Sequence, residues 1–254
     1  RYGSGTGGVC LRNVKRRVTS VECQVCIGPA EFTKLSTAVG SLTLSPEEHQ
    51  SLGELEQYLV HGEGSWALGD EFLAFIGQCI RHRCGAVSLA TLRCLAAMAL
   101  RDDVSLLLHQ DRRSHAVMNY ARRIDQLPLA EQCALALALC NLFENISSSE
   151  WLLYISEWEA DGQAVSNIRV TTKVAVHATL SEDAALRDVG TALMYNMATK
   201  EVKTVVCIYL RVPGKLGSPY KRSYALIFKR LANVCRPVIS LCSFRYHSKK
   251  IQRI

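Results

Sequence analysis

The sequence predicts an all-α protein in which many short helices stack into a bundle or a helical repeat. Apolar residues recur at helical spacing from residue 45 to residue 202, and no stretch between turn signals keeps the strict apolar alternation of a strand. A loose pattern, in which a leucine is followed by an apolar run and a polar stop, recurs around 89–101, 135–146 and 186–198. These intervals, near 46 and 51 residues, approach the ~40 to 47 of armadillo and HEAT repeats. The expected fold is therefore an armadillo/HEAT-like helical repeat (α-solenoid) with irregular N- and C-terminal extensions.

The first helix of this series has the clearest start. Ser45 stands before Pro46, which suits the first helical position, and Glu48 follows three residues after the serine, which is the spacing of a capping box. Leucines then recur at spacings of three and four, as they do on the buried face of a helix. A helix is therefore expected over about 46–60.

Further helices are expected in chain order, each where a cap or break signal precedes apolar residues at helical spacing. Ser147 and Glu150 repeat the capping-box spacing, and Ser166 or Asn167 can cap the helix after that. Because the joints are short, neighbouring helices must pack antiparallel. The expected ranges are 70–80, 86–100, 104–109, 114–124, 128–143, 147–155, 167–180 and 182–199.

Charge divides the chain into three parts. Residues 18–202 carry 13 Lys/Arg against 23 Asp/Glu, whereas residues 203–254 carry 12 Lys/Arg and no acid. The first 17 residues add 5 Lys/Arg and no acid, so the net charge of +7 describes two basic ends on an acidic body. We expect a poorly structured segment over 1–44, a helical domain over 45–202 and a basic tail over 203–254.

The sequence favours a protein that is not an enzyme and that needs no cofactor or metal. Cys23 and Cys26 have the spacing of a redox pair or half a zinc site, but no second Cys-x-x-Cys or His-x-x-x-His completes it. The glycine-rich stretch over 3–8 has no preceding apolar strand and no phosphate-binding Lys-Ser/Thr after it. Paired carboxylates fall at helix starts or breaks, where they serve the helix dipole.

The apolar runs, the start of the chain and its cysteines indicate where in the cell the protein is expected. The longest nearly uninterrupted apolar run, 133–143, is shorter than the ~20 residues of a membrane helix, and no signal-peptide pattern opens the chain. Eleven scattered Cys fit buried thiols in a reducing compartment. We expect a soluble cytoplasmic or nuclear protein, and its start at Arg1 favours a fragment of a longer chain.

Four stretches resemble a known family. The run 134–143 is a small-residue apolar helix ending in Asn and Phe, Asn167-Ile168 follows a Ser-rich joint, and 190–196 carries a Thr, Leu and Asn core, while 90–95 resembles an early helix of the family. This pattern resembles the PUL domain, the armadillo-like module that ends phospholipase A-activating protein and follows PPPDE-type or thioredoxin-like domains elsewhere. The resemblance covers about 70–202 and rests on patterned positions. The family's final helical repeat has no counterpart here, so the module is expected to be C-terminally truncated.

The resemblance implies a docking function. PUL domains bind the acidic C-terminal tail of the hexameric AAA segregase valosin-containing protein in a basic groove on their concave face, which links it to ubiquitin-pathway proteins. Arg93 stands at the matching position of the early helix and is the first expected tail contact. Arg169 and Lys173, four residues apart and followed by His177, share one helix face and are expected to add charge-assisted hydrogen bonds.

Asn141 and Asn196, which end or interrupt apolar helices, are the expected contacts to the backbone of the bound peptide. Each of these peptide-binding predictions has a structural alternative. A helical Arg/Lys stripe can be a solvated face, and an Asn near a helix end can be a cap or a buried bridge. A generic helical-repeat scaffold for another protein partner is the competing function.

The basic tail over 203–254 has two interpretations. An acid-free stretch of this length, with no helical period after Val202, fits a translated intron or an alternative exon end, so the segment is expected to be non-native or disordered. The alternative is an RNA or anionic-membrane binder, because aromatic residues interleave with its cations as stacking platforms do. Outside this tail, neither nucleic acid nor membrane is an expected partner.

Overall fold

A computed structural model describes residues 27–40, 42–69, 71–82, 85–111 and 114–211. The chain divides into two compact units, 1–201 and 202–254. The pair Cys23 and Cys26, the glycine-rich stretch over 3–8 and the tail from 212 onward lie outside the described residues, so the predictions made for them stay predictions.

The described part is mostly helical, which confirms the all-α prediction at that level. Three short 3₁₀ helices accompany the α-helices: η1 (Ser65–Ala67), η2 (Ile124–Gln126) and η3 (Leu142–Glu144). The α-helices are α2 (Ile27–Val39), α3 (Pro46–Leu59), α4 (Phe72–His82), α5 (Gly85–Met98), α6 (Val104–Gln110), α7 (Ala116–Ala121), α8 (Leu129–Asn141), α9 (Ile146–Leu152), α10 (Asn167–Thr179) and α11 (Ala184–Arg211).

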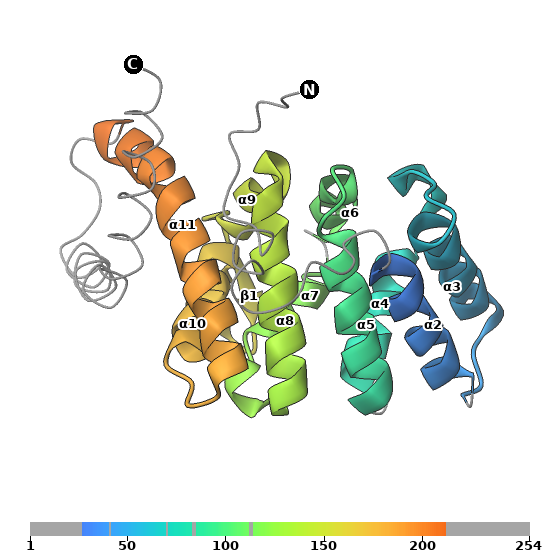
Figure 1. Ribbon diagram of the computed structural model, residues 1–254. Coiled ribbons are helices and arrows are strands. Elements are labelled where there is room, and N and C mark those ends of the chain that lie inside the picture. The colour runs from blue at the N-terminus through green and yellow to red at the C-terminus, as the bar shows by residue number, and fades with distance from the viewer. Residues whose placement is uncertain (1–26, 41, 70, 83–84, 112–113, 212–254) are drawn as a thin grey trace, which may run out of the picture. The chain divides into compact units, whose positions relative to one another are not determined.

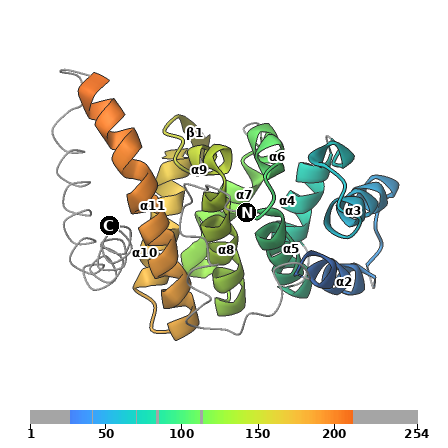
Figure 2. The same cartoon turned by 45° about the horizontal axis from the view of Figure 1, so that its top comes forward.

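Helices three elements apart in the chain pack side by side. Helix α5 packs between α2 and α8, α7 packs between α4 and α10, and α6 packs on α9. Figures 1 and 2 show α2, α5 and α8 as neighbours, with α4, α7 and α10 lying against them. Because α5 and α8 each have neighbours on several sides, their sequences are apolar nearly all round.

The apolar core runs between these packed helices. Its largest fully buried side chains come from successive helices and connections, which shows that one core extends through the described helices of the first unit. They are Leu35, Leu55, Tyr58, Phe72, Ile76, Leu92, Met98, Met118, Ile124, Leu135, Leu139 and Phe143.

The predicted capping box at the start of α3 is confirmed. The Ser45 hydroxyl accepts a hydrogen bond from the Glu48 backbone N–H at 3.2 Å, and the Glu48 carboxylate accepts one from the Ser45 N–H at 2.9 Å. The second predicted box is wrong. Helix α9 begins at Ile146 after Asn145, so Ser147 lies inside the helix and cannot cap it.

The prediction of a poorly structured segment over 1–44 is wrong for its described part. Helix α2 occupies Ile27–Val39 and packs on α5 through Phe32, Leu35 and Val39, all of which are buried. These three side chains recur at spacings of three and four, so a single helical face was present in the sequence. Only the contact with α5 makes burial of that short face favourable.

A β-hairpin replaces the strand-free connection that was expected before α10. Strands β1 (Glu157–Ala160) and β2 (Gln163–Ser166) pair antiparallel. The two loop residues, Asp161 and Gly162, both have positive φ (50° and 72°), which is the geometry that an Asp-Gly type I′ turn requires. The Asp-Gly pair was the sequence signal for this hairpin. The residues on either side of it alternate only weakly between apolar and polar, so the strands were not predicted.

The expected end of helical structure at Val202 is also wrong, because α11 continues to Arg211. No helix in the described residues combines the length and the apolar composition that a bilayer crossing requires.

Candidate functional site

Arg93 lies on the solvent side of α5. Its helix packs on α2, α4 and α8, and the residues on both sides of it, Leu92 and Cys94, are fully buried, whereas Arg93 itself is exposed. Within the part of the chain that the structure describes, no hydrogen bond or ion pair engages its guanidinium. Arg93 is therefore available to an anionic group.

Arg169 and Lys173 share one face of α10, as predicted, but each is already paired with an acid. Arg169 lies 3.0 Å from the Glu157 carboxylate, and its guanidinium also donates to the Ala164 carbonyl at 3.1 Å. Lys173 lies 2.5 Å from the Asp125 carboxylate. The hydrogen bond from Lys173 holds the pKa of Asp125 below its ordinary value, so the carboxylate stays ionised and the pair persists at neutral pH.

The other residue of this stripe, His177, faces α8. Its Nε2 lies 2.9 Å from the side-chain oxygen of Gln132. Helix α10 packs on α7, α8 and α9, whereas α5 packs on α2, α4 and α8. Arg93 thus belongs to the row formed by α2, α5 and α8, whereas the α10 cations belong to the row formed by α4, α7 and α10. Only Arg169, Lys173 and His177 are brought onto one face.

Asn141 and Asn196 lie in the core and join helices. The Asn141 amide donates to the Ala96 carbonyl of α5 at 2.8 Å, and the Asn196 amide donates to the Cys140 carbonyl of α8 at 3.4 Å. Asn141 is 5% exposed and Asn196 is fully buried. This is the placement of the buried bridge that was the alternative to a peptide contact, because neither amide group is at the surface.

The structure has an exposed apolar edge that was not predicted from the sequence. Trp66 on η1 is 77% exposed, Leu106 on α6 is 61% exposed and Ile146 on α9 is 63% exposed. Helix α6 contacts both η1 and α9, so these side chains come from adjacent elements. We call Trp66, Leu106 and Ile146 the apolar edge. Its one sequence signal was a tryptophan inside a Gly/Ser-rich turn that belongs to no helical pattern.

Trp66 sits on a loop that is held in place by Asp103. The Asp103 carboxylate accepts hydrogen bonds from the Ser65 backbone N–H at 2.6 Å and from the Tyr58 hydroxyl at 2.7 Å. The Arg101 guanidinium lies 4.0 Å from the centre of the Tyr58 ring and donates to the Glu63 carbonyl at 2.6 Å. These contacts order the loop, so Trp66 is presented without the entropy loss of fixing a mobile segment.

No protein-family model, curated protein or solved structure significantly matches the chain. The resemblance to the PUL domain therefore stays a prediction. Among the described residues, no group of three or more His, Cys, Asp and Glu side chains is arranged to hold a metal ion.

Proposed function

We propose that this chain is a non-catalytic docking domain built as an armadillo-type helical repeat, in which α2–α4, α5–α7 and α8–α10 are successive units and α11 begins the next. The packing of helices three elements apart supports this assignment. The observation that carries it is the repeated asparagine bridge. Asn141 of α8 donates to the carbonyl of Ala96 in α5, and Asn196 of α11 donates to that of Cys140 in α8.

The proposed ligand is an acidic extended segment, for which the C-terminal tail of valosin-containing protein is the named candidate, and the docking would serve ubiquitin handling. Arg93 supports this ligand because its exposed guanidinium can make bidentate hydrogen bonds to a carboxylate. Arg169 and Lys173 would have to exchange Glu157 and Asp125 for carboxylates of the ligand. Such exposed ion pairs contribute only about 0–1 kcal/mol, so the exchange costs little.

Fluorescence anisotropy of a labelled acidic tail peptide tests this function. The Arg93→Glu protein is expected to bind at least about tenfold more weakly, because an attractive charge becomes a repulsive one. Arg187→Glu is the matched control, since Arg187 is also exposed but lies on α11 and is not one of the proposed contacts. If both charge reversals weaken binding equally, or if neither changes it, the result would count against a site at Arg93.

A second candidate is a scaffold whose partner docks on the apolar edge. Large exposed aromatic side chains on ordered loops are typical anchors of protein interfaces, and Trp66 fits this description beside Leu106. The same titration separates the two candidates. Binding that is lost in Trp66→Ala or Leu106→Glu and kept in Arg93→Glu would place the ligand on the apolar edge.

A further inference from the structure

Two side chains of the apolar edge are tied to the same residue, Asp103. The Asp103 carboxylate accepts a hydrogen bond from the N–H of Ser65, the residue before Trp66, at 2.6 Å. The Asp103 backbone carbonyl accepts one from the Leu106 N–H at 3.1 Å. Trp66 and Leu106 therefore stand on neighbouring stretches of backbone, although they come from different elements.

The third side chain of the edge, Ile146, is joined to the same connection. The amide of Asn145, the residue before it, donates to the Arg101 carbonyl at 2.8 Å. Cα atoms of α6 come within 8 Å of Cα atoms of both η1 and α9, and Figures 1 and 2 show α6 and α9 side by side. The edge is thus a row of three apolar side chains on adjacent elements, and packed helices lie roughly 8–10 Å apart.

The indole of Trp66 is positioned by Gly64. A Cβ at Gly64 would lie 2.7 Å from both Cδ1 and Nε1 of the indole, so the ring rests against a residue without a side chain. Gly64 has a φ of −72°, which alanine also adopts, so the glycine serves the approach of the ring and not the backbone. The indole is held in one position while 77% of Trp66 stays exposed to solvent.

Acidic residues surround the apolar edge. The segments that carry its side chains contain five Asp or Glu and no Lys or Arg; these segments are 60–67, 102–110 and 144–152. Exposed Asp102 and Glu150 stand four residues from Leu106 and Ile146 respectively, so a carboxylate lies about one helical turn from each. Arg101, directly before the second segment, donates its guanidinium hydrogen bonds to backbone carbonyls at the end of α3. The edge therefore combines apolar side chains with negative charge.

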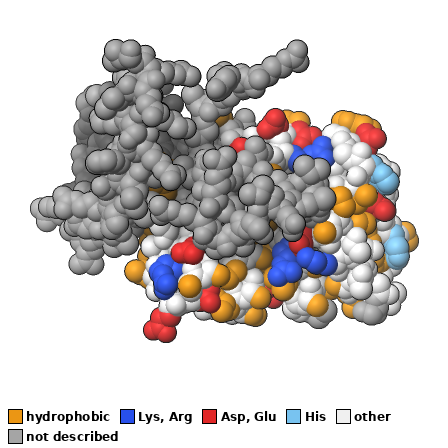
Figure 3. Space-filling model, in the orientation of Figure 1, with side chains coloured by type: hydrophobic (Ala, Val, Ile, Leu, Met, Phe, Trp, Pro, Cys, Tyr) orange, Lys and Arg blue, Asp and Glu red, His pale blue; other side chains and the backbone are white. Residues whose placement is uncertain are grey.

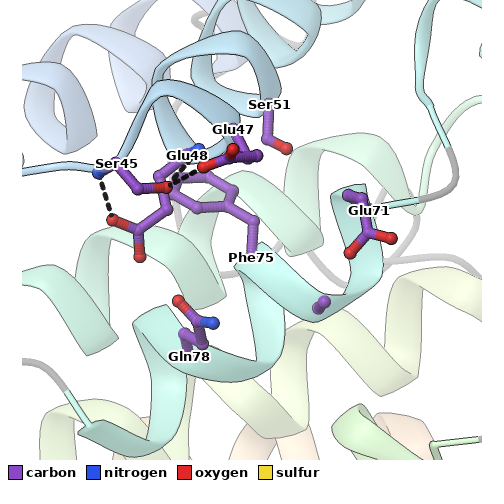
Figure 4. A pocket seen from close by; sticks show the side chains of 8 residues that line it. Ser45, Glu47, Glu48, Ser51, Glu71, Phe75 and Gln78 are labelled. Atoms are coloured by element: carbon purple, nitrogen blue, oxygen red, sulfur yellow. Dashed lines mark hydrogen bonds between the residues drawn. The ribbon is translucent and has the colours of Figure 1, made fainter.

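The apolar edge is distinct from the acidic start of α3. Figure 4 shows Glu47 and Glu48 around Ser45, at the first turn of that helix, whereas η1 follows its last turn. The 14 residues of α3, at about 1.5 Å each, separate the two by about 20 Å. Figure 3 shows hydrophobic and acidic side chains next to each other along the upper rim of the described surface.

The spacing and the charge of the edge indicate the partner that fits it. In an α-helix, side chains about seven residues apart on one face are ~10 Å apart, which matches the distance between adjacent elements of the edge. Lys or Arg beside such an apolar stripe would meet the carboxylates of the edge. A second copy of this chain fits less well, because it would bring like charges together.

We propose that the apolar edge binds an amphipathic helix of a partner protein, with Lys or Arg on both sides of the apolar stripe of that helix. The proposal rests on the second candidate function above and specifies its partner. Trp66 is the main anchor, because its indole is large, exposed and already fixed in position. Leu106 and Ile146 extend the apolar contact, and Asp102 and Glu150 pair with the flanking cations.

Fluorescence anisotropy with a labelled, blocked helical peptide of about 18 residues tests the proposal, since that length spans three adjacent elements. The lysine peptide carries leucine at every third or fourth position and lysine beside each leucine. One control peptide has the same residues in scrambled order, and the other has glutamate in place of every lysine. The lysine peptide is expected to bind the full chain saturably and at least about tenfold more tightly than either control at physiological salt.

Variants locate the binding on the edge. Trp66→Ala is expected to weaken binding of the lysine peptide at least about tenfold, and Leu106→Ala about threefold. Leu180→Ala is the matched control for Leu106→Ala, since Leu180 is 73% exposed at the end of α10. Gly64→Ala keeps Trp66 but displaces its indole, so it is expected to weaken binding about threefold with an unchanged urea midpoint.

The outcomes separate this proposal from the function on which it rests. If the lysine and glutamate peptides bind equally and Trp66→Ala abolishes both interactions, the edge is a docking surface but a basic helix is the wrong partner. If Trp66→Ala and Leu180→Ala bind the lysine peptide equally well, both the basic helix and a docking site on the edge are contradicted. The absence of saturable binding of the lysine peptide would also overturn the proposal. Binding of the acidic tail at Arg93 is measured with its own peptide and does not depend on these results.

Discussion

The hydroxyl of Tyr58 donates a hydrogen bond to Oδ1 of Asp103 at 2.7 Å, although 45 residues separate the two in the chain. Tyr58 is fully buried at the end of α3, and Asp103 precedes α6. Burial, with the neighbouring carboxylate, raises the pKa of the Tyr58 hydroxyl, so it remains a donor across the physiological range. This bond joins two successive units of the proposed repeat.

Asp103→Ala is expected to destabilise the protein by about 2 kcal/mol, because the Tyr58 hydroxyl and the Ser65 N–H both lose an acceptor. Tyr58→Phe removes one of these bonds and is expected to cost about 1 kcal/mol. The free energy of unfolding from urea titration measures both. The neighbouring Asp102→Ala is the control, since exposed Asp102 is expected to change stability by less than about 0.5 kcal/mol. Equal effects at 102 and 103 would refute the role of the bridge.

Asn141→Ala is expected to cost about 1–3 kcal/mol, because the Ala96 carbonyl would be left buried without its donor. Asn196→Ala should show a similar loss if the two bridges are equivalent. Asn119 also donates to a carbonyl, that of Ser114, but at a partly exposed position, so Asn119→Ala is expected to change little. The urea midpoint separates these cases, and a large loss at Asn119 with none at Asn141 would contradict the bridge model.

Gly190→Ala and Gly53→Ala are expected to have opposite effects. A Cβ at Gly190 would lie 2.4 Å from the Thr179 backbone nitrogen, so α11 could no longer approach the end of α10 and the cost should reach about 3 kcal/mol. A Cβ at Gly53 in α3 meets nothing within 4 Å.

Because alanine favours helix over glycine, Gly53→Ala is expected to stabilise the protein by about 0.5–1 kcal/mol. Thermal unfolding of the two variants beside the unmodified chain measures the difference. A tolerated alanine at 190 would mean that α10 and α11 are not in close contact.

Asp111 is expected to make stability depend on pH. Its carboxylate caps the start of α7, where it accepts from the Ala116 backbone N–H at 2.7 Å and from the Ser114 hydroxyl at 2.9 Å. Burial nevertheless raises its pKa to about 6, against the lowering effects of these bonds and of the Arg81 charge. Because the folded pKa lies above the unfolded one, the protonated group stabilises the fold below pH ~4, and that contribution is lost as pH rises to about 6.

The contribution is on the order of 3 kcal/mol, since each pKa unit corresponds to about 1.4 kcal/mol. Asp111→Asn keeps an oxygen that can accept the Ala116 N–H but does not titrate. The difference in the free energy of unfolding between the two proteins, measured from pH 4 to 7, should therefore change through this window and level off above it. A difference that stays constant with pH would show that Asp111 does not titrate there.

Interactions within one turn of helix were predictable from the sequence, because both partners stand within four residues of each other. The capping box of Ser45 and Glu48 and the shared face of Arg169 and Lys173 are of this kind. Helix α2 and the Asp161-Gly162 turn also had local signals, but each is stabilised by a partner element that the local pattern does not identify.

The sequence by itself determined that apolar faces at helical spacing would build an all-α protein, because helical period and capping depend on near neighbours. Only the tertiary structure decided that Lys173 pairs with Asp125, 48 residues away, and that Asn141 and Asn196 bridge buried helices. Whether a cation or an amide is available to a ligand depends on which distant groups the packing places beside it. A pairing between residues far apart in the chain produces no periodic pattern in the sequence.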